Sequence, residues 1–352
     1  MRKKVLIGGG GTGGHLYTAI ALSELLTEKD MDVLIIGSSH GIENRILKKY
    51  DFKYILLPIY GFMGKKIFYK LKSVFSLLYA TIRVFLIILR FKPQAVIGVG
   101  GFVSFPVVFA AFMLAKKRAI LEQNSIPGKA NKLLSHISNM VFVNFPQTKN
   151  YFKCNVEVVG NPVRKLTSCT ERRDFLHNGT LHLLVLGGSR GAHSINEAMM
   201  TFAKMYVKTK KKKIFVVHQT GREDYKKVKK SYEILNLSWE VYDFIEDMGR
   251  VYEKSDMVLS RAGASVISEI ACAGLPAIFV PFPYAIYHHQ YINAKYAEET
   301  GGSITIEDSK LNGNVIGEII SDIDKNRLFS MSKGIRKLYN NQSIERIYHW
   351  IS

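Results

Sequence analysis

A run of glycines near the start of the chain has the composition of a phosphate-binding turn. Gly8-Gly9-Gly10-Gly11-Thr12-Gly13-Gly14-His15 follows the apolar stretch Val5–Ile7 and opens a helical stretch over His15–Leu26. Glycines at such a turn let the backbone approach a phosphate or a sugar closely, with helix N–H groups aimed at it. His15 could serve there as a general base near neutral pH, or it could only cap or pack the helix.

Two further turns follow expected strands in the second half of the chain. Gly187-Gly188-Ser189-Arg190-Gly191 comes after Leu181–Leu186, and Ser260-Arg261-Ala262-Gly263-Ala264-Ser265 comes after Met257–Leu259. The first is not a P-loop, because no Gly-Lys-Ser/Thr closes it. A single turn of this kind is compatible with a tight connection that binds nothing, but three in one chain indicate a phosphorylated ligand with several parts.

A nicotinamide cofactor is disfavoured, although Gly9, Gly11 and Gly14 match the pattern G-x-G-x-x-G. A dinucleotide site also needs an acidic residue at the end of the second strand, where it binds the ribose. The expected strand Val33–Ile36 is followed by Gly37-Ser38-Ser39 instead. No cofactor is therefore expected.

Amide side chains cluster in Leu121-Glu122-Gln123-Asn124 and around Gln290 and Asn293. Amides both donate and accept hydrogen bonds, so they suit sugar hydroxyls, although each could equally anchor a loop.

No metal site is expected. The pairs Asp30/Asp32 and Asp322/Asp324 lie in polar stretches away from the glycine turns, and the adjacent His288 and His289 project in different directions. Three cysteines without a CxxC pair offer no cysteine zinc site.

Strands and helices alternate along the whole chain, which predicts an α/β fold with parallel sheets covered on both faces. The pattern restarts at Leu181, so two Rossmann-like domains in series are expected, over residues 1–163 and 164–352, facing each other across a cleft. Ligands in such sheets bind beyond the carboxyl ends of the strands. A last helical stretch is expected over Ile335–Ile351, and it could pack back on the first domain.

The formal net charge is +20, and +14 of it lies in residues 1–163. No acidic residue occurs from Phe52 to Leu121, where 11 Lys and Arg residues stand. Such an excess points to an acidic partner, which could be a nucleic acid, an anionic lipid or a phosphorylated substrate.

An amphipathic stretch lies within this basic region. Apolar residues recur at helical spacing from Ile67 to Leu89, and the cations around them are Lys65, Lys66, Lys70, Lys72, Arg83, Arg90 and Lys92. This composition is typical of a helix that lies in a membrane interface, although a core helix with solvated lysines would look alike. A membrane-spanning helix is not expected, because Arg83 divides the apolar run. Arg2-Lys3-Lys4 is followed by too short an apolar stretch for a signal peptide.

In order and spacing, these stretches resemble the MurG family of GT-B glycosyltransferases. The similar blocks are GGGGTGGH (8–15), GVGGFVSFP (98–106), LEQNSIPGKANKLLS (121–135), VGNPVR (159–164), LGGSRGAHSIN (186–196), FIEDM (244–248), SRAGASVISEIACAGLPAIFVPFP (260–283) and HQYINA (289–294). The resemblance implies transfer of N-acetylglucosamine from UDP-N-acetylglucosamine to O4 of a muramyl-pentapeptide linked to undecaprenyl pyrophosphate. It also implies a peripheral position on the cytoplasmic face of the bacterial membrane, with no nucleic acid as partner.

The resemblance further assigns roles to individual residues. His15 is implied as the base that deprotonates the muramyl O4, and Glu269 as the carboxylate on the ribose. The backbone of Ile245 is implied to read uracil, and Arg164 to close over the nucleotide. The remaining donor-binding residues implied are Thr12, Gly13, Gly14, Asn124, Ser189, Ala264, Ser265, Val266, Ile267, Ser268 and Gln290.

The implied reaction is a single inverting displacement in which backbone N–H groups and helix N-termini stabilise the leaving UDP without a metal ion. Thr18 stands where the family commonly has Pro, and Phe102 where it commonly has Tyr, so the acceptor side departs from the family pattern.

Two rival functions remain open: another GT-B enzyme, such as a lipid glycosyltransferase or a UDP-N-acetylglucosamine 2-epimerase, and a basic nucleic-acid-binding protein. The basic residues stand among aliphatic rather than stacking aromatic residues, which disfavours the nucleic-acid function.

Overall fold

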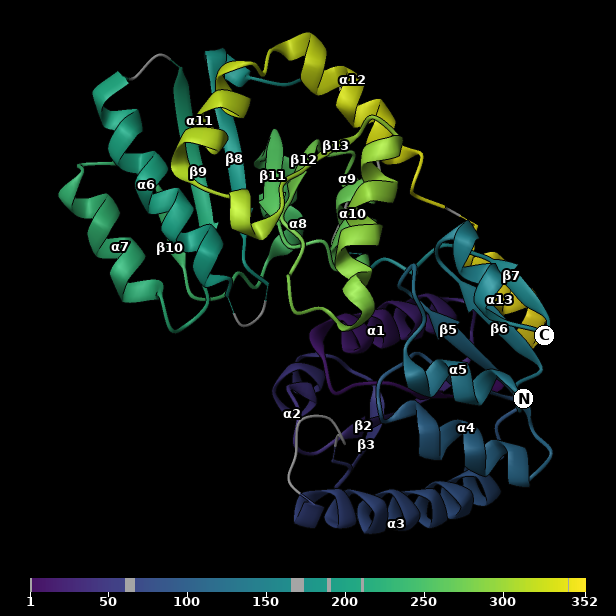
Figure 1. The fold of residues 1–352 in the computed structure, drawn as a ribbon. Coiled ribbons are helices and arrows are strands. Elements are labelled where there is room, and N and C mark those ends of the chain that lie inside the picture. Colours follow the sequence, from purple (N-terminus) through teal and green to yellow (C-terminus); the bar gives the residue numbers. More distant parts are fainter. Residues whose placement is uncertain (1, 61–66, 166–173, 189–190, 210–211, 341) are drawn as a thin grey trace. The chain divides into compact units, whose positions relative to one another are not determined.

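A computed structural model describes residues 2–60, 67–165, 174–188, 191–209, 212–340 and 342–352, without the side chains of residues 67–72. The chain forms two compact units (Figure 1). Unit 1 contains Met1–Arg164 together with Asn340–Ser352, and unit 2 contains Lys165–Tyr339. Each unit is an α/β domain with one parallel sheet, which confirms the predicted fold class of two Rossmann-like domains.

Unit 1 alternates strands and helices along the chain. Its elements are β1 (Lys4–Gly8), α1 (Gly13–Glu28), β2 (Asp32–Ser38), α2 (Glu43–Ile46), β3 (Lys53–Leu57), α3 (Ile67–Phe91), β4 (Ala95–Gly98), α4 (Ser104–Met113), β5 (Lys117–Glu122), α5 (Lys129–Ser135), β6 (Met140–Val143), β7 (Val156–Val158) and α13 (Ser343–Ile351).

The sheet of unit 1 has the order β3-β2-β1-β4-β5-β6-β7 and is parallel throughout. Successive residues of β1 point to opposite faces of the sheet. Val5 and Ile7 therefore pack with α1 and α13, whereas Leu6 packs with α3 and α4. Because both faces are covered, the central strands read as continuous apolar runs rather than as an alternating pattern.

Unit 2 repeats this construction. Its elements are β8 (Thr180–Leu186), α6 (His193–Thr209), β9 (Lys213–Gln219), α7 (Tyr225–Ile234), β10 (Glu240–Tyr242), α8 (Met248–Lys254), β11 (Met257–Ser260), α9 (Ala264–Ala273), β12 (Ala277–Phe279), α10 (His289–Glu299), β13 (Ser303–Thr305), α11 (Gly313–Ser321) and α12 (Lys325–Arg336).

The parallel sheet of unit 2 has the order β10-β9-β8-β11-β12-β13. Leu183 and Val185 pack with α6, α7 and α11 on one face, and Leu184 packs with α8, α9 and α10 on the other. In each unit the first strand, β1 or β8, lies beside the fourth, β4 or β11. The strand order reverses there, and such switch points are where α/β sheets bind ligands.

The end of the chain differs from the sequence prediction. The single helix expected over Ile335–Ile351 is wrong, because α12 ends at Arg336 and α13 begins at Ser343. Ile335 belongs to a core cluster of unit 2, whereas Ile344, Ile347 and Ile351 belong to the core of unit 1. In Figure 1 the yellow α13 lies beside β6, where Trp350 meets Phe142 edge-on.

The helix that carries the basic apolar stretch also differs from expectation. Arg83 does not divide it, since α3 continues from Ile67 to Phe91. By length and composition, its Ser73–Phe91 part is long and apolar enough to cross a membrane. One face of this part is in the core, however, where Ala80, Val84 and Ile88 are fully buried. Lys65 and Lys66 lie outside the described residues, as do the side chains of Lys70 and Lys72.

Candidate active site

Most of the predicted site residues lie in the loops at the switch point of each sheet or in the first turns of the helices that follow these loops. In unit 1 the first glycine turn follows β1, and Val99-Gly100-Gly101-Phe102 follows the adjacent β4. In unit 2 the turn starting at Gly187 follows β8, and Arg261-Ala262-Gly263 follows the adjacent β11. Both units therefore present backbone N–H groups at the edge where a parallel sheet binds its ligand.

The glycine turn of unit 1 surrounds a buried carboxylate. Gly10 and Gly11 have φ values of 153° and 83°, and a Cβ at Gly10 would lie 2.1 Å from Oε1 of Glu43. This Oε1 accepts a hydrogen bond from the N–H of Gly11 at 2.6 Å and from that of Ser38 at 3.4 Å. Glu43 is fully buried at the start of α2. The Glu43 side chain thus holds the turn in place through hydrogen bonds, a role that was not predicted from the sequence.

His15 lies in the first turn of α1, beside the second loop of unit 1. Its Nδ1 is 2.9 Å from the hydroxyl of Thr12, the N-cap residue of α1. A Cβ at Gly100 would lie 2.8 Å from Nε2 of His15, and one at Gly101 would lie 3.1 Å from Nδ1. Gly100 and Gly101 have φ values of 94° and 75°, so glycine suits both positions in backbone and in space. The predicted base therefore stands against a surface that has no side chains.

Asn124 is held by the carboxylate that precedes it on β5. Oε1 of Glu122 accepts hydrogen bonds from the backbone N–H of Asn124 at 2.9 Å and from its Nδ2 at 3.2 Å. Oε2 accepts from Asn131 at 2.8 Å and from the N–H of Gly128 at 3.1 Å. Burial raises the pKa of the Glu122 carboxyl, and these hydrogen bonds oppose the rise. The carboxylate orders the loop from Asn124 to the start of α5.

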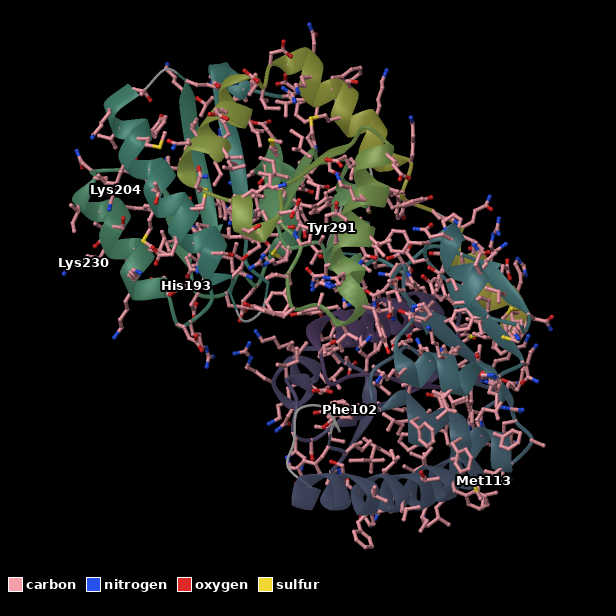
Figure 2. The ribbon with its side chains drawn as sticks, in the orientation of Figure 1. Phe102, Met113, His193, Lys204, Lys230 and Tyr291 are labelled. Carbon is pink, nitrogen blue, oxygen red and sulfur yellow. The ribbon has the colours of Figure 1, made fainter. Side chains whose placement is uncertain are left out.

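Arg164 stands at the end of the chain segment that forms most of unit 1. Its guanidinium lies 4.1 Å from the centre of the Tyr17 ring on α1, and the residue is buried. Thr18, one of the two departures from the family pattern, hydrogen-bonds to Oδ1 of Asn161 at 3.4 Å. Phe102, the other departure, covers Gly11: a Cβ there would meet the Phe102 ring at 2.3 Å. Figure 2 labels Phe102 on the loop that leads into α4.

In unit 2 a buried glutamine connects the second glycine turn with Ile245. Nε2 of Gln219 donates to the carbonyl of Gly188 at 3.0 Å, and its Oε1 accepts from the N–H of Ile245 at 2.8 Å. Because the N–H of Ile245 already donates to Gln219, the carbonyl of Ile245 is the backbone group with which it can bind a nucleobase. Ser189, a predicted diphosphate contact, lies outside the described residues.

The start of α9 presents a row of backbone N–H groups. Gly263 is the N-cap residue, and the helix begins at Ala264. Ser265 and Val266 are half-buried, whereas Ile267 and Ser268 are buried, with the Ser268 hydroxyl donating to the carbonyl of Ala264. The N–H groups of the first turn, from Ala264 to Val266, favour an anion. The N–H of Ile267 instead donates to the carbonyl of Gly263 at 3.0 Å.

Two further predicted donor residues lie on helices of unit 2. Glu269, buried on α9, accepts a hydrogen bond at 3.1 Å from the hydroxyl of Tyr252 on α8. Gln290 lies at the start of α10, and its Oε1 accepts from the N–H of Phe282 at 2.9 Å. Both side chains are thus positioned by neighbouring elements of the same unit.

Arg261 connects three loops of unit 2 at the carboxyl edge of the sheet. Its guanidinium donates to the hydroxyl of Ser194 at 2.9 Å, to the carbonyl of Val280 at 3.2 Å and to the carboxylate of Asp308. It therefore holds the start of α6, the end of β12 and the segment after β13 together. The sequence gives no signal for this role beyond the basic residue in the third turn.

A buried polar network lies behind the second glycine turn. His218 is fully buried on β9, with Nδ1 2.9 Å from the hydroxyl of Tyr232 and Nε2 2.9 Å from Oδ1 of Asn196. The Nδ2 of Asn196 donates to Thr220 and Asp224, so Oδ1 faces the imidazole and His218 carries its proton on Nε2. Burial lowers the pKa of His218 to about 3, which the charge of Asp224 opposes.

Three of the four carboxylates in the two Asp-x-Asp pairs have structural partners. Asp30 pairs with Arg2 at 2.7 Å, and Asp32 pairs with Lys53 at 2.8 Å. Asp324 caps α12 by accepting the N–H of Arg327 at 2.7 Å. Within the described ranges, no group of three or more His, Cys, Asp or Glu side chains could hold a metal ion.

Comparisons with known proteins cover both units. The glycosyltransferase family 28 N-terminal domain matches residues 5–143, and the glycosyltransferase family 28 C-terminal domain matches residues 182–347. The chain is 40% identical over 328 residues to the UDP-N-acetylglucosamine--N-acetylmuramyl-(pentapeptide) pyrophosphoryl-undecaprenol N-acetylglucosamine transferase of Thermodesulfovibrio yellowstonii, covering 91% of this chain and 89% of that protein.

Comparisons with solved structures lead to the same family as the sequence comparisons. The crystal structure of Acinetobacter baumannii MurG matches with a TM-score of 0.78 and 28% identity, covering 100% of this chain and 99% of that one. A UDP-N-acetylglucosamine 2-epimerase, described as putative, from Listeria monocytogenes matches with a TM-score of 0.73 over 99% of this chain and 95% of its own, but at 15% identity. The likeness to the epimerase shows the fold alone.

Proposed function

This chain belongs to the MurG family within glycosyltransferase family 28, and we propose that the loops at the two switch points carry the reaction of that family. The enzyme is a hexosyltransferase of peptidoglycan synthesis. It transfers N-acetylglucosamine from UDP-N-acetylglucosamine to the lipid-linked muramyl-pentapeptide. The observation that carries this assignment is the 40% identity to a curated transferase over 91% of the chain, which spans both units.

His15 is proposed as the base that receives the proton of the attacking O4 hydroxyl. The hydroxyl of Thr12 lies 2.9 Å from Nδ1, so a proton on Nδ1 can be donated to it and Nε2 is left as the basic atom. Nε2 lies, with Cδ2, on the side of the ring that faces Gly100. Transfer of the proton to Nε2 lets O4 attack the anomeric carbon as the bond to UDP breaks, which inverts that carbon.

Unit 2 is proposed to hold the nucleotide. The N–H groups at the start of α9 suit the diphosphate, whose negative charge grows as UDP leaves. The Glu269 carboxylate, oriented by Tyr252, suits the ribose hydroxyls, and the carbonyl of Ile245 suits the N3–H of uracil. Arg164, Asn124 and Gln290 are proposed as further donor contacts, together with Thr12, Gly13, Gly14 and Ser189.

The enzyme acts at the bacterial membrane, and we propose that α3 lies flat on its cytoplasmic surface. The outer face of the described part of α3 exposes Phe75 (70%), Leu78 (57%), Ile82 (62%) and Leu86 (55%). Arg83 and Arg90 are exposed on the same helix, and no acidic residue occurs in this region. An apolar stripe flanked by cations is typical of a helix at an anionic lipid surface.

The packing of α3 supports a flat position rather than a membrane-spanning one. The inner face of α3 is part of the core that contains α4, with which it runs side by side (Figure 1). A helix whose inner face is held by a folded domain cannot be surrounded by lipid. Met113, at the end of α4, is 57% exposed and lies at the same outer side of the unit as α3 (Figure 2).

Transfer of labelled N-acetylglucosamine tests the proposed function. The purified chain should move label from UDP-N-acetylglucosamine to a lipid-linked muramyl-pentapeptide, equally well with and without EDTA. A reaction without acceptor should leave the donor unchanged, because an epimerase would instead convert it. Absence of labelled lipid product in the complete reaction would contradict the assignment.

A further inference from the structure

Gln123 is a buried amide that the proposed reaction does not yet use. It follows β5 directly and is 2% exposed. Its Nε2 donates to the carbonyl of Val99 at 2.7 Å, and since a carbonyl only accepts, this bond fixes which end of the amide is nitrogen. Among the described residues, its Oε1 has no hydrogen-bond partner. A buried acceptor without a donor is costly, so such an atom calls for a ligand.

The position of Gly100 shows where this oxygen points. A Cβ at Gly100 would lie 3.4 Å from Oε1 of Gln123 and 2.8 Å from Nε2 of His15. The carbonyl oxygen of Gln123 and the imidazole nitrogen of His15 therefore lie against the same side of Gly100, in the loop after β4. A side chain at Gly100 would displace the imidazole, and the φ of 94° also favours glycine at this position. Oε1 of Gln123 can accept a hydrogen bond, and Nε2 of His15 beside it can accept a proton.

The chemistry of the acceptor sugar determines which of its groups can donate a hydrogen bond to Gln123. If His15 receives the proton of O4, as proposed above, Oε1 of Gln123 should accept a hydrogen bond from a group next to O4 on the same sugar. O3 of a muramyl residue carries the lactyl ether and has no proton, whereas the C6 hydroxyl lies on the other side of O4 and can donate. We propose that Oε1 of Gln123 accepts a hydrogen bond from the C6 hydroxyl of the acceptor and so positions O4 at His15. This inference rests on the proposed transferase function.

A 6-deoxy acceptor tests the contact. Labelled N-acetylglucosamine transfer is measured with a short-chain lipid-linked muramyl-pentapeptide and with its 6-deoxy analogue, for the wild type and for Gln123→Met. The wild type should lose about threefold to tenfold in kcat/KM on the 6-deoxy acceptor, as expected for one hydrogen bond. Gln123→Met should be slower on the normal acceptor and should lose nothing more on the analogue.

Matched controls separate this contact from a structural role. Gln94 precedes β4, at the opposite end of this strand from Gly100, and accepts a hydrogen bond from the N–H of Lys4. Gln94→Met should therefore discriminate between the normal and the 6-deoxy acceptor as the wild type does. Equal loss on the 6-deoxy acceptor in wild type and Gln123→Met would overturn the inference, as would no loss in the wild type. If the wild type transferred nothing to the normal acceptor, the proposed function itself would fail.

A second variant keeps the test decisive if Gln123→Met does not fold. Gln123→Glu retains an acceptor oxygen and loses only the donor to Val99. It should therefore still discriminate against the 6-deoxy acceptor by about the wild-type factor. A folded Gln123→Glu enzyme without this discrimination would overturn the inference as well.

Discussion

The carboxylate of Glu43 and the backbone N–H of Gly11 are 2.6 Å apart, which joins the start of α2 to the glycine turn after β1. The same turn leads to Thr12 and His15. An acidic side chain without solvent contact thus supports the loop that is proposed to carry the base. Its other oxygen, Oε2, has no hydrogen-bond partner within the described part of the chain.

Removal of this support should loosen the turn. Glu43→Ala should lower the free energy of unfolding by about 1–3 kcal/mol, because it leaves the buried N–H of Gly11 without an acceptor, and should reduce kcat. Glu43→Gln should be milder, since its carbonyl oxygen can still accept. Urea denaturation and the transfer assay measure both effects. Glu223→Ala, at an exposed carboxylate of unit 2, should change neither.

Loss of the imidazole should affect chemistry rather than donor binding. His15→Ala should lower kcat by about 10²- to 10⁴-fold, the usual contribution of a general base, with an unchanged Kd for UDP-N-acetylglucosamine. Thr12→Val should lower kcat less, and Thr12→Ser should restore it through the retained hydroxyl. His136→Ala, at an exposed histidine, is the control. Unchanged turnover of His15→Ala would remove His15 as the base.

Loss of the Glu269 carboxylate should affect donor binding instead. Glu269→Ala should raise the Kd of UDP about 10- to 100-fold, because hydrogen bonds to a charged group are lost. Tyr252→Phe should raise it less, as it removes only the hydroxyl that orients Glu269. Calorimetry with UDP and with a nucleotide that lacks both ribose hydroxyls tests whether Glu269 binds these hydroxyls. If Glu269→Ala weakened both nucleotides equally, the carboxylate would not bind the ribose.

The outer face of α3 should determine membrane binding. Phe75→Ser with Ile82→Ser should reduce cosedimentation with anionic vesicles while activity on a water-soluble acceptor is kept. Ile234→Ser removes an equally exposed apolar side chain, 73% exposed, from unit 2 and should change nothing. Binding of the wild type to duplex and single-stranded DNA at the same salt concentration should be weaker than binding to vesicles. Undiminished vesicle binding of the double variant would exclude α3 as the contact.

The buried His218 should make stability depend on pH. Its pKa is about 3 in the folded protein and about 6.5 when unfolded. Below pH 6.5 the unfolded chain therefore binds a proton that the folded chain does not. The stabilisation is complete above pH 6.5 and decreases as the pH falls toward 3. Between pH 7 and 4.5, Tm should fall less in His218→Gln than in the wild type. The control His136→Gln, at an exposed histidine, should fall as steeply as the wild type. An equally steep fall in His218→Gln would argue against this account.

Much of the fold followed from local pattern. Val5–Ile7 and Leu181–Leu186 predict strands because continuous apolar runs suit a sheet covered on both faces, and the glycines after them predict turns. The pairing of β1 with β4 is a long-range choice that no local pattern contains. The short strand β13 was missed, since Ser303–Thr305 is three residues long and only partly apolar. The break between α12 and α13 was also missed, because isoleucines at helical spacing occur on both sides of it.

The site was less predictable than the fold. His15 and the glycine turns are visible in sequence because their residue types are unusual at those positions. Glu43, Gln123 and His218 act through burial, and burial depends on which elements pack together. Residue type alone would assign a glutamate or a glutamine to the surface. The supporting residues of the site therefore became apparent only from the three-dimensional structure.

The position of α13 has a consequence for how the protein is made. Synthesis runs from residue 1 to residue 352, yet the core of unit 1 includes Ile344, Ile347 and Ile351. Unit 2 is continuous from Lys165 to Tyr339, so all of its chain is synthesised before α13. The domain that is translated first is thus completed last. Until then, the part of this core that Ile344, Ile347 and Ile351 cover stays unfilled.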